Sequence, residues 1–123
     1  MLKILIADDS IFMRTWLKKL LFELNDQVFA EASTGKEAIE IYRQFKPDIV
    51  TMDITMQDLN GIDALKEIIQ FDPDAKVIMC SALGQKSVII EAIKLGAIDF
   101  VVKPNFHNLV DIIKKYNHLL LEL

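Results

Sequence analysis

Five short apolar runs alternate with longer amphipathic segments along the chain. The runs lie at residues 2–7, 27–32, 48–52, 75–80 and 98–102, and they are rich in Val and Ile. Each is about 5 or 6 residues long, which is typical of strands buried on both faces of a sheet. The pattern therefore predicts five strands.

The segments between these runs have the apolar spacing of helices. The predicted buried stripe of the first helix consists of Met13, Leu17, Leu20, Leu21 and Leu24. Capping and helix-ending residues bound the others: Ser33 or Thr34 and Pro47 for the second, Gly61 and Asp72-Pro73 for the third, residue 85 and Gly96 for the fourth, and Phe106 for the start of the fifth.

Strands that alternate with helices predict the α/β class, because each parallel connection needs a crossover. We expect a doubly wound five-stranded parallel sheet with strand order 2-1-3-4-5. Such a sheet places its functional site at the carboxyl ends of the strands, near the point where the strand order reverses. The 123 residues fit one domain, residues 1–123, with no room for a second of ordinary size.

Composition excludes several classes of protein. With 52% hydrophobic and 26% charged residues, the chain can form a core, so disorder is excluded. A single cysteine, Cys80, excludes a disulfide framework and favours a reducing, cytoplasmic location. A net charge of −4 with no basic run argues against direct nucleic-acid binding. No apolar run approaches the roughly 20 residues of a membrane span.

Charged and polar side chains follow the predicted strands. Strand one ends in Asp8 and Asp9, strand three in Asp53, strand four in Ser81 and strand five in Lys103. At an effective dielectric of about 20, each close carboxylate pair costs on the order of 4 kcal/mol. Protonation of one acid or a bound cation would remove this repulsion, and a hard ion such as Mg²⁺ prefers oxygen ligands. With Lys103 opposite, the site suits phosphoryl transfer to a carboxylate, and Asp53 on the central strand is the most enclosed.

Five separated motifs, in this order, resemble the receiver domains of response regulators, most closely the chemotaxis-type single-domain members. The matching segments are residues 6–14, 46–56, 60–64, 79–82 and 96–104. The resemblance covers nearly the whole chain and implies the flavodoxin-like, or CheY-like, fold. It also implies a phospho-accepting switch of a two-component system, with self-catalysed phosphotransfer and autodephosphorylation and no other enzymatic activity.

The resemblance assigns a role to each site residue. Asp53 would be the phospho-acceptor, supplied by a sensor histidine kinase. Mg²⁺ would be held by Asp8, Asp9, Asp53 and the backbone carbonyl of Thr55. Ser81 and Lys103 would contact the phosphoryl group, and the Lys103-Pro104 peptide would be cis.

The family's switch implies a partner for the chain. On phosphorylation Ser81 would move toward the phosphoryl group and Phe100 would turn inward. The surface of the fourth helix, fifth strand and fifth helix would then bind a protein target, for which the flagellar motor switch is one candidate; a phosphatase is another partner to consider. We expect a monomer or a weak dimer.

Two other interpretations stay open at this stage. One is a receiver domain excised from a longer regulator with a DNA-binding or enzymatic output, although Met1 and the end at the fifth helix favour a freestanding protein. The other is a flavodoxin-like ligand binder, which is disfavoured because Asp8 and Asp9 would repel an FMN phosphate and no Gly-rich loop follows strand one.

The chain departs from the family pattern at three positions. Gln57 replaces a usual proline, which predicts altered mobility of the loop beside the metal. Phe100 replaces a frequent tyrosine and so lacks a hydroxyl. Asn105 replaces a frequent phenylalanine on the predicted target surface.

Other conspicuous residues have structural explanations that compete with functional ones. Ser10 is expected to cap the first helix, and Cys80 to be a buried small hydrophobic residue. Phe12 and Trp16 either pack or help to dock a kinase. His107 and His118 lie too far apart to share a metal, and Gly61 and Gly96 are expected to serve backbone geometry.

The last helix carries more apolar residues than one stripe can bury. Its predicted buried stripe is Phe106, Leu109, Val110, Ile113, Tyr116 and Leu120. Four apolar residues fall outside that stripe: Ile112, Leu119, Leu121 and Leu123. These predict either a dimer or target contact or local packing.

Overall fold

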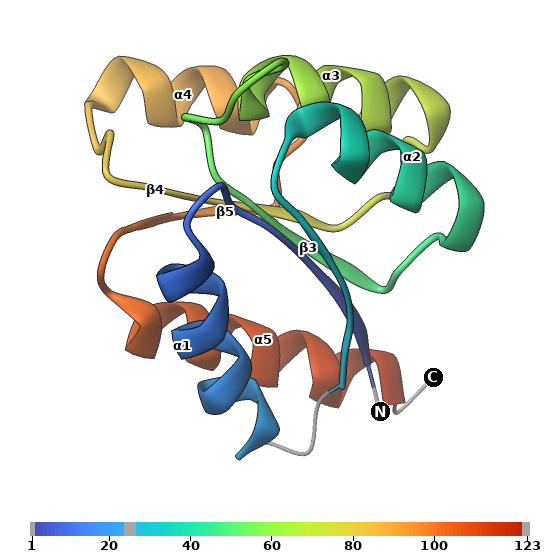
Figure 1. Ribbon diagram of the computed structural model, residues 1–123, viewed down its shortest axis with the longest axis vertical. Coiled ribbons are helices and arrows are strands. Elements are labelled where there is room, and N and C mark those ends of the chain that lie inside the picture. The colour runs from blue at the N-terminus through green and yellow to red at the C-terminus, as the bar shows by residue number, and fades with distance from the viewer. Residues whose placement is uncertain (1, 24–26, 122–123) are drawn as a thin grey trace.

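The computed structural model describes residues 2–23 and 27–121, and for residue 27 and residues 117–121 it describes the backbone alone. Strands and helices alternate through the chain (Figure 1). Their order is β1 (Lys3–Ala7), α1 (Ile11–Phe22), β2 (Gln27–Ala32), α2 (Gly35–Phe45), β3 (Ile49–Met52), α3 (Gly61–Phe71), β4 (Val77–Ser81), α4 (Lys86–Lys94), β5 (Asp99–Val102) and α5 (Phe106–Leu121).

The five strands form one parallel sheet with the order β2-β1-β3-β4-β5. The predicted class and strand order are therefore confirmed. Helices α1 and α5 cover one face of the sheet, and α2, α3 and α4 cover the other (Figure 1). In the strand order of this sheet, β1 and β3 are neighbours near the centre.

Each face of the sheet carries its own hydrophobic core. Along β1, Ile4 and Ile6 join the core beneath α1 and α5, while Leu5 and Ala7 join the core beneath α2, α3 and α4. Because both faces are buried, the strand reads as one apolar run rather than as an alternation.

The register between β1 and β3 brings their carboxyl ends level. Ala7 of β1 pairs with Met52 of β3. The amide of Asp53 then donates to the carbonyl oxygen of Ala7 at 2.9 Å, which extends the pairing beyond the last strand residue. Asp8 and Asp53 consequently leave the sheet as neighbours.

Helix boundaries follow the capping signals. Ser10 caps α1, since its hydroxyl accepts the amide of Met13 at 3.2 Å, as predicted. Thr34, rather than Ser33, caps α2 in the same way. After α4, Gly96 has φ 113°, a left-handed conformation that favours glycine at a helix end.

Strand four differs from its predicted range of 75–80. It begins later, because the amide of Ala75 donates to the carbonyl of Asp72 within a turn. It also includes Ser81, which pairs with Val102 of β5. The predicted site residue is thus the last residue of the strand itself.

The apolar stripes of α1 and α5 hold with two corrections. Val110 of α5 was predicted in the buried stripe, but it is only partly buried and is not among the described side chains packed against either core. On α1, Leu17 and Leu21 are buried, and Leu24 lies outside the described residues. On α5 the buried residues are Phe106, Leu109 and Ile113. Ile112 was expected outside the stripe, but it is partly buried against the same core. The side chains of Leu119, Leu120, Leu121 and Leu123 lie outside the described residues.

Candidate functional site

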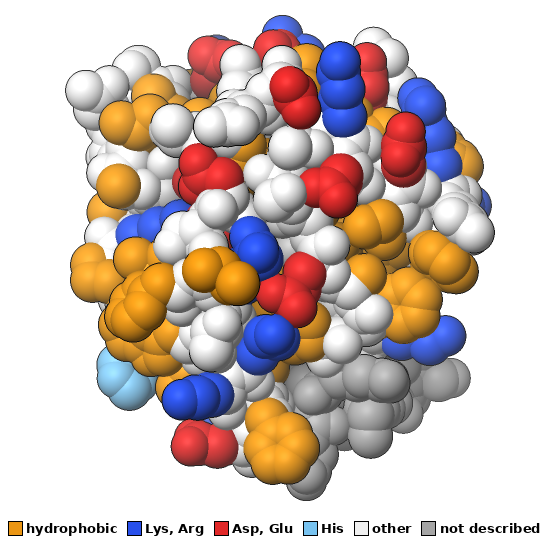
Figure 2. Space-filling view, viewed as in Figure 1, with side chains coloured by type: hydrophobic (Ala, Val, Ile, Leu, Met, Phe, Trp, Pro, Cys, Tyr) orange, Lys and Arg blue, Asp and Glu red, His pale blue; other side chains and the backbone are white. Residues whose placement is uncertain are grey.

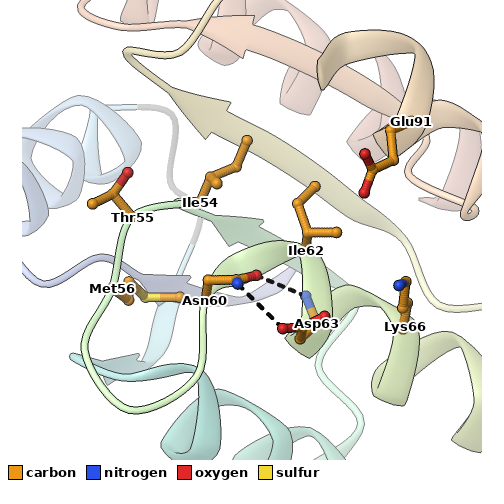
Figure 3. Close-up of a pocket in the computed structure, with 8 residues that line it drawn as sticks. All are labelled: Ile54, Thr55, Met56, Asn60, Ile62, Asp63, Lys66 and Glu91. Atoms are coloured by element: carbon orange, nitrogen blue, oxygen red, sulfur yellow. Dashed lines mark hydrogen bonds between the residues drawn. The ribbon is translucent and has the colours of Figure 1, made fainter. Parts of the chain in front are cut away.

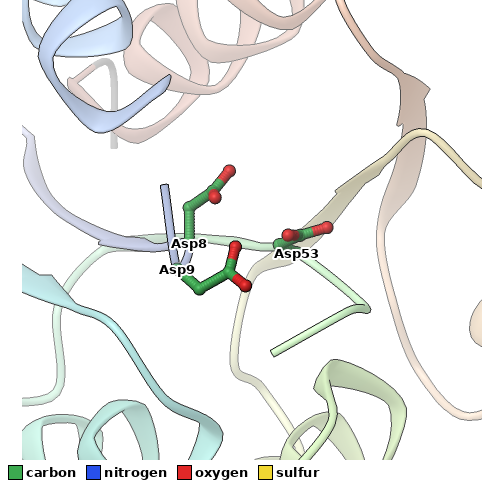
Figure 4. Close-up of side chains that lie close together, drawn as sticks. All are labelled: Asp8, Asp9 and Asp53. Carbon is green, nitrogen blue, oxygen red and sulfur yellow. The ribbon is translucent and has the colours of Figure 1, made fainter. Parts of the chain in front are cut away.

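Three carboxylates meet at the carboxyl edge of the sheet. One carboxylate oxygen from each of Asp8, Asp9 and Asp53 lies within 4.8 Å of the others. Figure 4 shows Asp8 and Asp9 side by side after β1, with Asp53 beside them at the end of β3. Asp8 and Asp53 are each only 6% exposed, whereas Asp9 is exposed. The predicted acidic cluster is therefore formed.

Asp8 makes a hydrogen bond through every polar atom it has. Its amide donates to the carbonyl of Ala32 at 3.0 Å, and its carbonyl accepts Nη1 of Arg14 at 2.5 Å. Its carboxylate accepts the amide of Ser10 at 2.9 Å on Oδ1 and Nζ of Lys103 at 2.5 Å on Oδ2. The two hydrogen bonds to its carboxylate, from Ser10 and Lys103, fix the orientation of the Asp8 side chain.

Lys103 reaches the acidic cluster from the end of β5. Its backbone amide donates to the carbonyl of Ser81 at 2.9 Å, and the following peptide to Pro104 is cis, as the resemblance implied. Its Nζ also lies 3.4 Å from Oδ2 of Asp53. Burial alone would lower the pKa of Lys103, but the hydrogen bond to Asp8 and the charge of Asp53 outweigh it and raise the pKa.

The environment of Asp53 opposes its ionisation. Burial raises the pKa of Asp53, and the negative charge of Asp8 raises it further, although the ammonium of Lys103 acts in the opposite direction. Three ionised carboxylates and one ammonium together carry a net charge of −2. The site thus contains a surplus of negative charge in a largely buried position.

The donor set fits a hard divalent cation. Its ligand atoms are all oxygens, two of the three carboxylates are buried, and a charge of +2 would neutralise the surplus. Thr55 lies two residues beyond Asp53 on the loop after β3, with an exposed side chain. Mg²⁺ matches these ligands better than a soft metal ion, which prefers thiolate or imidazole.

Ser81 is the last residue of β4, the strand beside β3, and Phe100 lies on β5, the next strand along. Ser81 is 1% exposed, and its hydroxyl accepts the amide of Leu83 at 3.1 Å. Phe100 on β5 is half-buried and packs against the core on the α2, α3 and α4 side of the sheet. The structure therefore brings Asp8, Asp9, Asp53 and Lys103 together, whereas the hydroxyl of Ser81 bonds within its own loop.

Two residues beside the site had no functional role in the sequence interpretation. Arg14 donates a hydrogen bond to the backbone carbonyl of Asp8. Its position one turn after the helix cap Ser10 could have indicated that its side chain lies near the start of α1. Gly61 was expected to serve backbone geometry alone, but a Cβ there would lie 1.9 Å from the carbonyl oxygen of Asp53. The close approach involves two distant segments, so local sequence patterns could not reveal it.

A cavity of about 400 Å³ lies over the loop between β3 and α3 (Figure 3). Its lining residues are Ile54, Thr55, Met56, Asn60, Ile62, Asp63, Lys66 and Glu91. Asn60 caps α3 within it and bonds to both the amide and the carboxylate of Asp63. None of the three carboxylates of the acidic cluster is among the residues that line this cavity.

The competing structural explanations can now be compared. Cys80 is buried, and burial raises its pKa to about 12, so it is an unreactive thiol. His107 is exposed, and the side chain of His118 lies outside the described residues. Gln57 forms an isolated parallel β-bridge with Thr34. The backbone amide of Asn105 donates to the carbonyl of Val102.

Phe12 and Trp16 of α1 differ from each other in exposure. Trp16 packs edge-on against Phe106 of α5, with ring centroids 4.9 Å apart. Phe12 is 69% exposed, and the centroid of its ring lies 6.3 Å from that of Trp16. Figure 2 shows hydrophobic side chains at the surface over the region where α1 and α5 lie.

Within the described part of the chain, no helix combines the length and apolar character needed to cross a membrane.

Comparisons with known proteins agree with this geometry. A family model described as the response regulator receiver domain matches residues 4–114. The chemotaxis protein CheY of Thermotoga maritima is 57% identical over 102 residues, which cover 83% of this chain and 85% of that protein. The chemotaxis protein CheY of Listeria monocytogenes is 54% identical over 104 residues, covering 85% and 87% respectively.

Solved structures give the same result. The structure of the CheX-CheY-BeF3-Mg+2 complex from Borrelia burgdorferi matches with a TM-score of 0.90 and 34% identity, covering 94% of this chain and 88% of that chain. The response regulator domain of Thermotoga maritima CheB matches with a TM-score of 0.85 and 37% identity, covering 99% and 97%.

Proposed function

Because this chain belongs to the family of response regulator receiver domains, we propose that residues 1–123 form a single phospho-accepting switch. The observation that carries the proposal is the cluster of Asp8, Asp9 and Asp53 with Lys103 among them. Its relatives are named chemotaxis proteins, which supports a role in chemotaxis.

Asp53 is the proposed phospho-acceptor. A carboxylate oxygen of Asp53 attacks the phosphorus of the donor, and the bond from phosphorus to the donor breaks, which leaves an acyl phosphate. Asp53 is buried at the end of a central strand, so water has limited access to it. The proposed physiological donor is the phosphohistidine of a sensor histidine kinase.

Charge compensation is the main task of the remaining site residues. Asp8, Asp9, Asp53 and the backbone carbonyl of Thr55 would hold Mg²⁺, which supplies positive charge to offset the phosphoryl oxygens when bound. Lys103 already lies 3.4 Å from Asp53 and would provide a second positive charge. The phosphoryl transfer is self-catalysed, because positioning and electrostatics perform most of such a reaction.

The proposed switch connects the site to the α4, β5 and α5 surface. Release of the Ser81 hydroxyl from the amide of Leu83 would let it bind a phosphoryl oxygen, and Phe100 would turn into the space behind it. On this surface Ile90, Ile93 and Val102 are 42%, 45% and 42% exposed. Large apolar side chains exposed together are typical of a protein-binding surface. We propose a protein target there, with the flagellar motor switch as one candidate.

Phosphorylation by a small donor tests the proposal. Incubation with acetyl phosphate and Mg²⁺, followed by intact-mass measurement, should show addition of one phosphoryl group. The Asp53→Asn variant should show none, because its amide is not a nucleophile, and chelation of Mg²⁺ should reduce the yield in the unsubstituted chain. An equal yield from the variant would overturn the assignment of Asp53.

A further inference from the structure

Arg14 is a charged side chain at the edge of the site that the proposed function leaves without a task. It lies on α1, and its side chain is only 14% exposed. Nη1 donates to the carbonyl oxygen of Asp8 at 2.5 Å, and Nε donates to Oε1 of Glu31 at 3.0 Å. The guanidinium is thus held between the segment after β1 and the neighbouring strand β2.

The choice of a carbonyl as partner matters for cation binding. A guanidinium usually pairs with carboxylates through two parallel hydrogen bonds, which here would occupy the oxygens needed by a metal ion. In this structure the carboxylate that accepts Nε of Arg14 is that of Glu31, which lies outside the acidic cluster. The other oxygen of Glu31 accepts Nζ of Lys18 at 3.0 Å, which fixes this carboxylate in place.

The carbonyl bound by Arg14 belongs to the peptide unit that joins Asp8 to Asp9. Asp8 is held through its other polar atoms as well, but no hydrogen bond of Asp9 occurs among the described residues. The direction of the Asp9 side chain therefore depends on the orientation of this peptide unit. Arg14 is the one side chain in the described structure that bonds to it.

We propose that Arg14 is a positioning residue that fixes the peptide between Asp8 and Asp9 and so orients Asp9 for a divalent cation. The inference rests on the proposed function, since it assumes that these carboxylates bind Mg²⁺. Partners of metal ligands commonly change metal affinity 10- to 100-fold when they are removed.

Mg²⁺ titration of the metal-free protein by calorimetry tests the proposal. Arg14→Met should raise the Kd for Mg²⁺ about 10-fold. Lys18→Met is the matched control, because it removes a positive charge from the same helix and a bond to Glu31 but leaves the contact to Asp8. Loss of a positive charge alone should strengthen cation binding, so the two variants should change the Kd in opposite directions.

A second measurement separates positioning from general stability. Amide hydrogen exchange of Asp9 and Ser10 in the metal-free protein should be faster in Arg14→Met than in Lys18→Met, relative to exchange in the core strands. Arg14→Lys keeps the charge but cannot donate in the same fork, so it should also raise the Kd. This variant decides the matter if Arg14→Met does not fold.

The outcomes distinguish the inference from its premise. An unchanged or lower Kd in Arg14→Met, or in Arg14→Lys where only that variant folds, would overturn the role of Arg14 while leaving the proposed function intact. A failure of the unsubstituted chain to bind Mg²⁺ would overturn the proposed metal site, and the inference with it.

Discussion

Gly61 lies directly against the backbone of Asp53. A Cβ built on Gly61 would come within 1.9 Å of the Asp53 carbonyl oxygen and 2.7 Å of its carbonyl carbon. The amide of Gly61 donates to the carbonyl of Ile54 at 2.8 Å, which closes the loop between β3 and α3. The beginning of α3 therefore rests on the residue proposed to accept the phosphoryl group.

We expect Gly61→Ala to destabilise the protein by about 1–3 kcal/mol, because backbone atoms must move to admit the methyl group. The displacement would also slow phosphorylation of Asp53. Urea unfolding measures the first effect, and the rate of adduct formation from acetyl phosphate measures the second.

The control for this variant is Gly84→Ala. There the added Cβ would meet a methyl group of Val102, a side chain that is 42% exposed, at 2.8 Å rather than backbone. A loss of stability from Gly61→Ala no larger than that from Gly84→Ala would contradict the steric argument.

Neutralising Asp9 should have opposite effects with and without Mg²⁺. In the absence of the ion, Asp9→Asn removes repulsion among three carboxylates and should stabilise the fold. In its presence, the unsubstituted protein should gain about 2.7 kcal/mol at an Mg²⁺ concentration of 100 times Kd, and the variant should gain less.

Thermal or urea unfolding at several Mg²⁺ concentrations measures this dependence. Glu67→Gln on the exposed side of α3 is a matched loss of one negative charge outside the site. If Asp9→Asn and Glu67→Gln responded alike to Mg²⁺, Asp9 would not be a ligand.

Removing the ammonium of Lys103 should separate cation binding from signalling. Lys103→Ala should still bind Mg²⁺, because the three carboxylates remain. It should lose the conformational response to phosphorylation, since no positive charge would draw β5 toward the phosphoryl group. Amide chemical shifts of β5 and α4, recorded before and after phosphorylation, report this response; shifts as large as those of the unsubstituted chain would disprove the role of Lys103.

The pair formed by Tyr42 and Asp72 should make stability depend on pH at both extremes. The Tyr42 hydroxyl donates to the Asp72 carboxylate at 2.7 Å. This bond lowers the pKa of Asp72. Burial, together with the bond, raises the pKa of Tyr42. The stabilisation should be present between about pH 4 and pH 10, lost below as Asp72 is protonated, and lost above as the unfolded chain ionises Tyr42.

Comparison with Tyr42→Phe isolates this contribution. The free energy of unfolding should be about 1 kcal/mol lower in the variant at neutral pH. The difference should shrink below about pH 4, which urea unfolding across a pH series would measure. A difference that stayed constant down to pH 2 would exclude the Asp72 carboxylate as its source.

The sequence predicted the parts of the site that follow from strand order. Asp8, Asp53 and Lys103 each directly follow the last residue of a strand, so the parallel sheet brings them to one edge. The contacts of Arg14 and Gly61 could not be predicted, because they depend on how a helix or loop packs against a distant backbone. The partial burial of Ile112 was missed because the stripe of α5 is wider than a single row of side chains.

Backbone pairing, rather than side-chain packing, determines the distance between the two buried acids. Because Ala7 pairs with Met52, Asp8 and Asp53 follow one another across adjacent strands, whose separation in any sheet is about 4.8 Å. Core substitutions that leave this pairing in place can weaken the protein without changing the spacing of the two backbones. The spacing of the Asp8 and Asp53 backbones should therefore tolerate those changes in the core sequence that preserve the pairing of β1 with β3.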